Sequence, residues 1–150
     1  MTLSGDINAL GRIGAHVESL ADVPRVAEWL VSERLERLVQ LQFDAGIDPD
    51  LEPWAPLAPA TVARGRHAPP LTDTRELRES LLVYPSAAGI RMSIGTADHP
   101  AGPHQDGWEG PQGSGPARKI FPTGEMPLAW SEVIDSAVLD AVTAKLGEVA

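Results

Sequence analysis

The chain has 150 residues, of which 43% are hydrophobic, and its formal net charge is −9. This length suits one domain with its own core, while the acidic balance argues against a nucleic-acid binder, because such proteins concentrate Lys and Arg to contact phosphates. The sequence has no cysteine, which excludes disulfide scaffolds and thiolate chemistry. We expect no leader segment and no membrane span, because no apolar run is long enough to cross a bilayer.

Residues 1–43 are expected to be helical. Apolar side chains at spacings of three and four predict an amphipathic helix over 6–20. Asp22 is then placed to act as an N-cap, and Pro24 suits the first turn of a second helix over 23–43. The buried stripe of this second helix is predicted to contain Val31, Leu35, Leu38 and Gln42.

Residues 44–70 are predicted to form a Pro-rich meander. Gly46 ends the preceding helix, and the four prolines between 48 and 59 prevent a continuous helix. We expect Trp54 to anchor this segment and a single helical turn to form at 61–66.

A short helix and a β-hairpin are predicted within residues 71–97. Asp73 followed by Glu76 has the spacing of a capping box, which favours a helix over 73–81. Its apolar face is expected to contain Leu77 and Leu81. Strands at 81–84 and 89–95 follow, since Ile90, Met92 and Ile94 alternate with Arg91 and Ser93.

The C-terminal helix is predicted over 128–148, where apolar residues recur at helical intervals without proline. Its buried positions are expected to be Trp130, Val133, Ile134, Ala137, Val138, Ala141, Val142 and Leu146. Of the other tryptophans, we expect Trp29 to lie in the core with Trp130, whereas Trp54 and Trp108 lie on loops and suit a core or an interface equally.

The fold class that follows is α+β, in a single domain spanning 1–150. Helices at both ends are expected to pack on a small, mainly antiparallel sheet, with a further strand from residues 116–122 and a long Gly/Pro-rich connector.

Residues 98–122 are predicted to be an extended docking loop. The part from Trp108 to Gly115 is rich in Gly and poor in apolar side chains, so it cannot offset the entropy of its own ordering. A long connector of this kind is unusual in a compact domain unless it lies against a neighbour. We therefore expect it to gain its order from contact with other subunits.

Two enzymatic readings compete with docking. Asp98, His99 and His104, with Asp106 and Glu109, have side chains that can bind zinc, which would make the protein a metal-dependent hydrolase. However, no His-Glu-x-x-His pattern fixes such ligands on one helix face. Ser114 lies between two glycines but lacks the Gly-x-Ser-x-Gly elbow of a nucleophilic serine.

The order of several motifs resembles the phage virion morphogenesis family, the tail completion proteins of Mu-like and related contractile-tailed phages. The resemblance covers about residues 40 to 140, and the order and spacing of the motifs carry it, since none of them is specific by itself. The matching residues are Phe43, Trp54, Leu57, Thr61 and Arg64; Leu71, Thr74, Leu77, Ser80 and Leu81; Ile94, Gly95 and Thr96; His104, Gln105 and Gly107; and Pro116, Arg118 and Phe121.

This resemblance implies a structural virion protein without catalysis, cofactor or metal. It would form a homo-oligomeric ring at the neck, the head-proximal end of the tail, and enable head-tail joining after assembly in the host cytoplasm. The implied partners are other copies of the chain and neighbouring tail tube, terminator or head-connector proteins, with neither sequence-specific nucleic acid nor membrane. A tail terminator or an adaptor of a phage-like contractile injection machine is the alternative within this class.

The residues carried over from the resemblance are expected to be mainly structural. They form the anchored loop, the helix before the hairpin, a turn and the return to the fold, and Trp108 is added as a docking residue. In that order they are Trp54, Leu57, Leu77, Leu81, His104, Gln105, Gly107, Pro116, Arg118 and Phe121. The family commonly has Gly where this chain has Arg75, which would be strained if that position requires a positive φ. It also commonly has a Tyr-Ala pair where this chain has Pro100 and Ala101.

Overall fold

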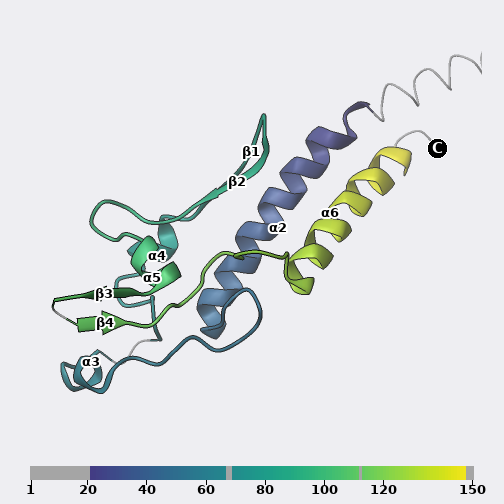
Figure 1. The fold of residues 1–150 in the computed structure, drawn as a ribbon. Helices are drawn as coiled ribbons and strands as arrows, with labels where there is room; N and C mark the ends of the chain where they lie inside the picture. The colour runs from purple at the N-terminus through teal and green to yellow at the C-terminus, as the bar shows by residue number, and fades with distance from the viewer. Residues whose placement is uncertain (1–20, 67–68, 112, 148–150) are drawn as a thin grey trace, which may run out of the picture.

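The computed structural model describes residues 21–66, 69–111 and 113–147. Two long helices, α2 (Val23–Ala45) and α6 (Leu128–Gly147), pack side by side, and two small antiparallel sheets lie along the rest of the body (Figure 1). The first sheet contains β1 (Leu82–Ser86) and β2 (Gly89–Ser93), and the second contains β3 (Trp108–Gly110) and β4 (Gly113–Gly115). Three short helices complete the order: α3 (Pro59–Ala63), α4 (Glu76–Glu79) and α5 (Gly102–Asp106). The predicted α+β class is confirmed.

Helix α2 follows its predicted bounds closely. Pro24 lies in its first turn, and Gly46 ends it in a left-handed conformation at φ 68°, where the Gly46 N–H donates to the Gln42 carbonyl. The predicted N-cap is wrong in one respect: Asp22 occupies the N-cap position, but its carboxylate makes no capping hydrogen bond and lies 3.6 Å from Arg25. The helix predicted over 6–20 lies outside the described residues.

The core forms where α2 meets α6 and the β1–β2 hairpin. Helices α2 and α6 run antiparallel, and Arg34 on α2 bonds to Ser136 and Asp140 on α6. In the hairpin, Tyr84 pairs with Arg91 and Pro85 with Ile90, close to the predicted strands. The buried apolar cluster contains Val31, Leu35, Val39, Phe43, Trp54, Leu77, Leu81, Ile120, Trp130 and Ala137.

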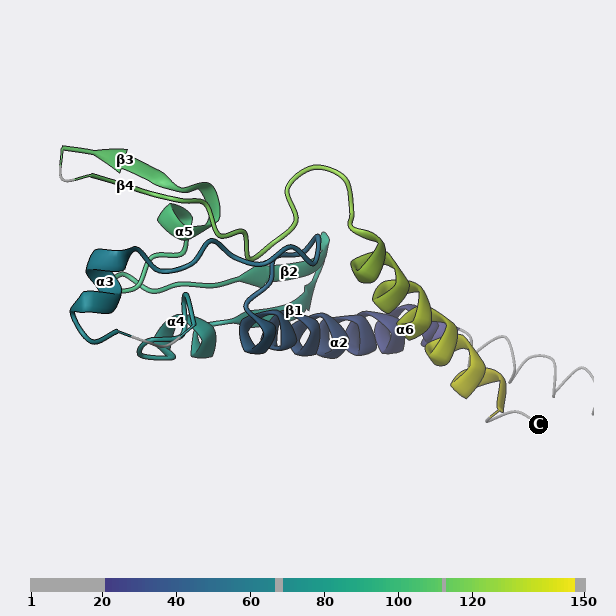
Figure 2. The same ribbon diagram turned by 90° about the horizontal axis from the view of Figure 1, so that it is seen from below.

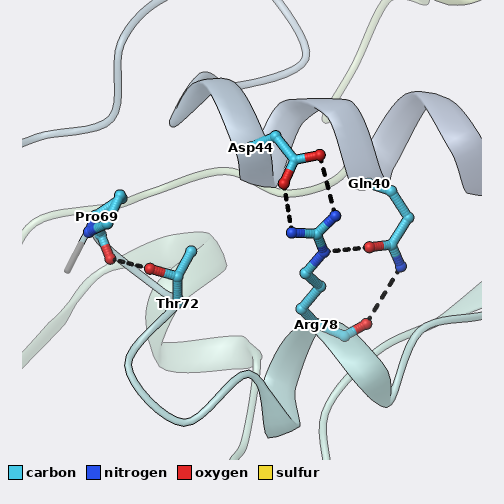
Figure 3. A network of polar contacts seen from close by, with 5 residues as sticks. All are labelled: Gln40, Asp44, Pro69, Thr72 and Arg78. Carbon is cyan, nitrogen blue, oxygen red and sulfur yellow. Dashed lines mark hydrogen bonds and ion pairs between the residues drawn. The ribbon is translucent and has the colours of Figure 1, made fainter.

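Polar contacts fasten α4 to the C-terminal half of α2 (Figure 3). The guanidinium of Arg78 forms a two-pronged ion pair with Asp44, at 2.5 Å and 3.1 Å, and its Nε donates to the side chain of Gln40. A bidentate Arg–carboxylate pair fixes orientation as well as distance. Arg78 therefore sets where the β1–β2 hairpin leaves α4.

Trp29 was expected in the core and is 61% exposed. It lies two residues from both Ala27 and Val31, which are buried. Two residues along an α-helix correspond to a rotation of about 200°, so Trp29 lies on the opposite face. Trp130, in contrast, is buried as predicted, with 2% of its surface exposed.

The strand predicted at 116–122 does not form. Side chains take the place of a partner strand: Gln42 donates to the Ile120 carbonyl, Trp54 donates to the Lys119 carbonyl, and Gln105 bonds to Ile120 and Phe121. Because the backbone groups are satisfied in this way, the segment crosses the core without a ladder.

The predicted helix turns are shifted. The turn expected at 61–66 forms earlier, as α3. The helix expected over 73–81 is confined to α4, and Asp73 makes no capping bond but pairs with Arg66 at 3.1 Å. Arg75 takes the N-cap position of α4 with φ 62°, so this position does require the left-handed conformation that glycine adopts without strain.

The substitution Arg75→Gly is expected to raise the free energy of unfolding by about 1 kcal/mol, because an L-residue in this region is strained and glycine is not. Urea unfolding followed by circular dichroism measures the change. The matched control is Arg64→Gly, also an exposed arginine beside a short helix but with φ −82°, which should gain no stability. An equal gain in both variants would contradict the strain.

Candidate functional site

The β3–β4 hairpin projects from the body at the end opposite the N-terminal end of α2 and the C-terminal end of α6 (Figure 2). Trp108 pairs with Gly115 and Glu109 with Ser114. The described residues of this hairpin are exposed except for the half-buried Gly115. Because the sheet has two strands, the outer edge of each presents backbone groups that another chain can pair with.

Trp108 lies across its own hairpin. A Cβ atom on Gly115 would come within 2.1 Å of the Trp108 Nε1, so only glycine at this position allows the indole to lie this close to β4. The Trp108 side chain remains 44% exposed. A large aromatic surface held in one orientation and open to solvent is typical of an interface anchor.

The base of the hairpin is fixed within the chain. Gln105 on α5 accepts hydrogen bonds from the backbone N–H groups of Ile120, at 2.7 Å, and Phe121, at 3.1 Å, and donates to the Phe121 carbonyl at 2.8 Å. At Gly107, where φ is 75°, a Cβ would lie 3.0 Å from backbone atoms of Ala117 and Gly115. The expectation that all of residues 98–122 form an extended loop therefore needs correction: α5 and the base are tied to the body, and the tip projects.

Arg118 and Trp54 join the segment after β4 to the meander. Arg118 donates from Nε to the Ala55 carbonyl at 2.7 Å and from Nη2 to the Pro56 carbonyl at 2.8 Å. Trp54 Nε1 donates to the Lys119 carbonyl at 2.8 Å, and its ring makes an edge-on contact with Phe43. Three separate parts of the sequence are thus held together behind the projecting hairpin.

The remaining predicted residues lie in different surroundings. Leu77 and Leu81 are buried in the core, Phe121 packs against it half-buried, and Leu57 is half-buried beside a cavity. Pro116 is exposed, like Trp108.

The candidate metal ligands do not form a cluster. The imidazole of His99 pairs with Glu76, whereas that of His104 has no hydrogen-bond partner among the described residues. Burial, and secondarily the charge of Arg118, lower the pKa of His104, which keeps it neutral near pH 7. Across residues 21–66, 69–111 and 113–147, no group of three His, Asp or Glu side chains is arranged to hold a metal ion.

The outward side of α6 carries three exposed leucines whose exposure the periodicity did not indicate. Leu128, Leu139 and Leu146 are 72%, 65% and 43% exposed, on the side away from Ala137 and Ala141. Val138 and Leu146 were expected to be buried, but they are 41% and 43% exposed. The sequence could have indicated the exposure of Leu139, because this residue lies two residues from each buried alanine and therefore about 200° around the helix from both.

None of the described helices has the length and apolar character needed to cross a membrane. Comparisons of the chain with models of protein families, with curated proteins and with solved structures found no match.

Proposed function

We propose that this protein is a structural virion subunit of the tail completion class. It forms a homo-oligomeric ring at the head-proximal end of a phage tail and enables head-tail joining. The observation that carries the proposal is the projecting β3–β4 hairpin, with two unpaired edges and a half-exposed Trp108 on a base fixed by Gln105. The resemblance of the motif order to tail completion proteins supports a position at the head-proximal end of the tail.

The hairpin is suited to docking because its base is held by the rest of the chain while its tip is exposed. Gln105 and Arg118 hold the base without help from another chain, so a neighbour need order only the tip. Edge pairing with β3 or β4 supplies backbone hydrogen bonds, and burial of Trp108 supplies apolar contact.

The exposed leucines of α6, Leu128, Leu139 and Leu146, offer a second surface for an adjacent copy. Two different surfaces on one subunit are what a head-to-tail ring requires. The net charge of −9 favours a basic surface on the neighbouring tail or head-connector protein.

The substitution Trp108→Ala tests this function in the particle. We expect a genome lacking this gene to yield separate heads and tails in electron micrographs. The unaltered chain should restore joined particles, while Trp108→Ala should not, because the anchor of the docking hairpin is lost. Circular dichroism of the purified variant should show an unchanged fold, since the indole contacts its own hairpin rather than the core.

Trp29→Ala is the matched control, because Trp29 is also an exposed tryptophan but lies on α2. It should restore joining as well as the unaltered chain does. Joined particles from a genome lacking the gene would rule out the proposed function, and full restoration by Trp108→Ala would rule out the hairpin as the docking element.

A further inference from the structure

A cavity of about 340 Å³ lies between the meander, the loop before α4 and helix α5. Its apolar walls come from Leu57, Leu71, Leu77 and three prolines, Pro69, Pro100 and Pro103. His104 and Arg118 contribute polar groups from the α5 side. A mainly apolar hollow with a few convergent polar groups is the usual form of a ligand site.

The loop that forms one wall of this cavity is strained. Leu71 and Arg75 both have positive φ, at 66° and 62°, and Leu71, Asp73 and Thr74 line the cavity. Non-glycine residues in this conformation persist where the surrounding structure holds them, often at binding sites. The surrounding structure thus holds Leu71 and Arg75 in a backbone conformation that these residues do not favour by themselves.

The charge of Arg118 is not matched by a carboxylate among the described residues. Its guanidinium bonds to two backbone carbonyls and is partly buried, which lowers its pKa while leaving it charged. The other charged groups around the cavity have partners or face solvent: Arg66 pairs with Asp73, His99 pairs with Glu76, and Asp98 is exposed. Arg118 therefore presents a positive charge to the cavity and the unpartnered, neutral imidazole of His104 presents a hydrogen-bonding group, while the carboxylates of Asp73 and Asp98 lie elsewhere in the lining.

We propose that this cavity binds an aliphatic carboxylate: a branched hydrocarbon group packs against the leucine and proline walls, and its carboxylate lies between Arg118 and His104. Charge-assisted hydrogen bonds to a guanidinium are stronger than neutral ones, and partial burial strengthens them further. A free branched-chain acid and a protein segment with Leu beside Glu carry this same chemistry. The inference concerns a different surface from the docking hairpin and does not depend on the ring.

The test titrates the full chain with 4-methylpentanoate and, as the neutral match, 4-methylpentanamide, followed by NMR of the leucine methyl groups and the His104 imidazole. We expect saturable shifts at Leu57, Leu71 and Leu77 and at least tenfold weaker binding of the amide. The bound carboxylate should also raise the pKa of His104, because a nearby negative charge favours the imidazolium. Equal binding of acid and amide, or an unchanged His104 pKa at saturation, would overturn the proposal.

A second pair of probes distinguishes the two sources of the carboxylate. Tighter binding of acetyl-Leu-Glu-amide than of 4-methylpentanoate identifies a protein segment, and the reverse order identifies a free acid. Neither probe showing saturable binding would overturn the proposal.

Arg118→Gln should remove the preference for acid over amide. Since this variant also loses bonds to Ala55 and Pro56 and risks unfolding, Thr74→Phe, which fills the cavity from its exposed rim, provides an independent block. A folded Thr74→Phe protein that binds 4-methylpentanoate as well as the unaltered chain would place the acid elsewhere and contradict the site.

Discussion

Gln105→Ala is expected to lower the free energy of unfolding by about 3 kcal/mol, because three hydrogen bonds are lost and buried backbone groups are left without partners. Ile120, whose backbone N–H loses its acceptor, is fully buried. Water therefore cannot replace the side-chain amide of Gln105 at this position. Urea unfolding followed by tryptophan fluorescence measures the loss. Amide hydrogen exchange should also accelerate across residues 107–117, since the base of the docking hairpin is released.

Gln105→Glu separates the two halves of this contact. The carboxylate keeps an acceptor for the N–H groups of Ile120 and Phe121 but no longer donates to the Phe121 carbonyl. We expect an intermediate stability between the Ala variant and the unaltered chain. A Gln105→Ala protein as stable as the unaltered one would show that Gln105 does not fix the hairpin base.

Trp54→Ala is expected to lower the free energy of unfolding by about 4 kcal/mol, the range found for removing a large aromatic side chain from a core. Trp54 is 6% exposed, its ring centroid lies 5.3 Å from that of Phe43 at an interplanar angle of 75°, and its Nε1 donates to Lys119. The variant therefore loses apolar burial, an aromatic contact and a hydrogen bond together. Thermal and urea unfolding both report the change.

Two further tryptophan variants apportion this effect. Trp54→Phe keeps a ring against Phe43 and should lower stability by about 1–2 kcal/mol, mainly through the lost N–H donor. Trp29→Ala removes the same side chain from an exposed site and should change stability by less than about 0.5 kcal/mol. Similar losses for Trp29→Ala and Trp54→Ala would contradict the burial described for these residues.

The helices and strands whose apolar residues recur at regular intervals could be predicted from the sequence. Helical periodicity located α2 and α6 to within about two residues, and alternation located the β1–β2 hairpin, because each pattern reflects which face is buried. The prediction failed at Trp29, Val138 and Leu146, which were expected to be buried because they are hydrophobic and which the structure shows exposed.

The candidate site depends on contacts between distant residues, for which the sequence offers little local signal. Gln105, on α5, forms hydrogen bonds with the backbones of Ile120 and Phe121. These side-chain bonds take the place of bonds to a neighbouring strand, which is why the strand predicted at 116–122 is wrong. Three of the six residues in strands β3 and β4 are glycine, and glycine carries no strand pattern. Arg75 is a partial exception, since the resemblance raised strain there on the condition of a positive φ, and the structure has φ 62° at this residue.

The central claim, that this chain is a ring-forming subunit, is tested most directly by native mass spectrometry of the full chain over a range of concentrations. The ring account predicts that the mass converges on one closed oligomer as concentration rises, and that Trp108→Ala or Leu139→Glu shifts the distribution toward single chains. A single-chain mass at every concentration, for the unaltered protein as for both variants, would contradict it.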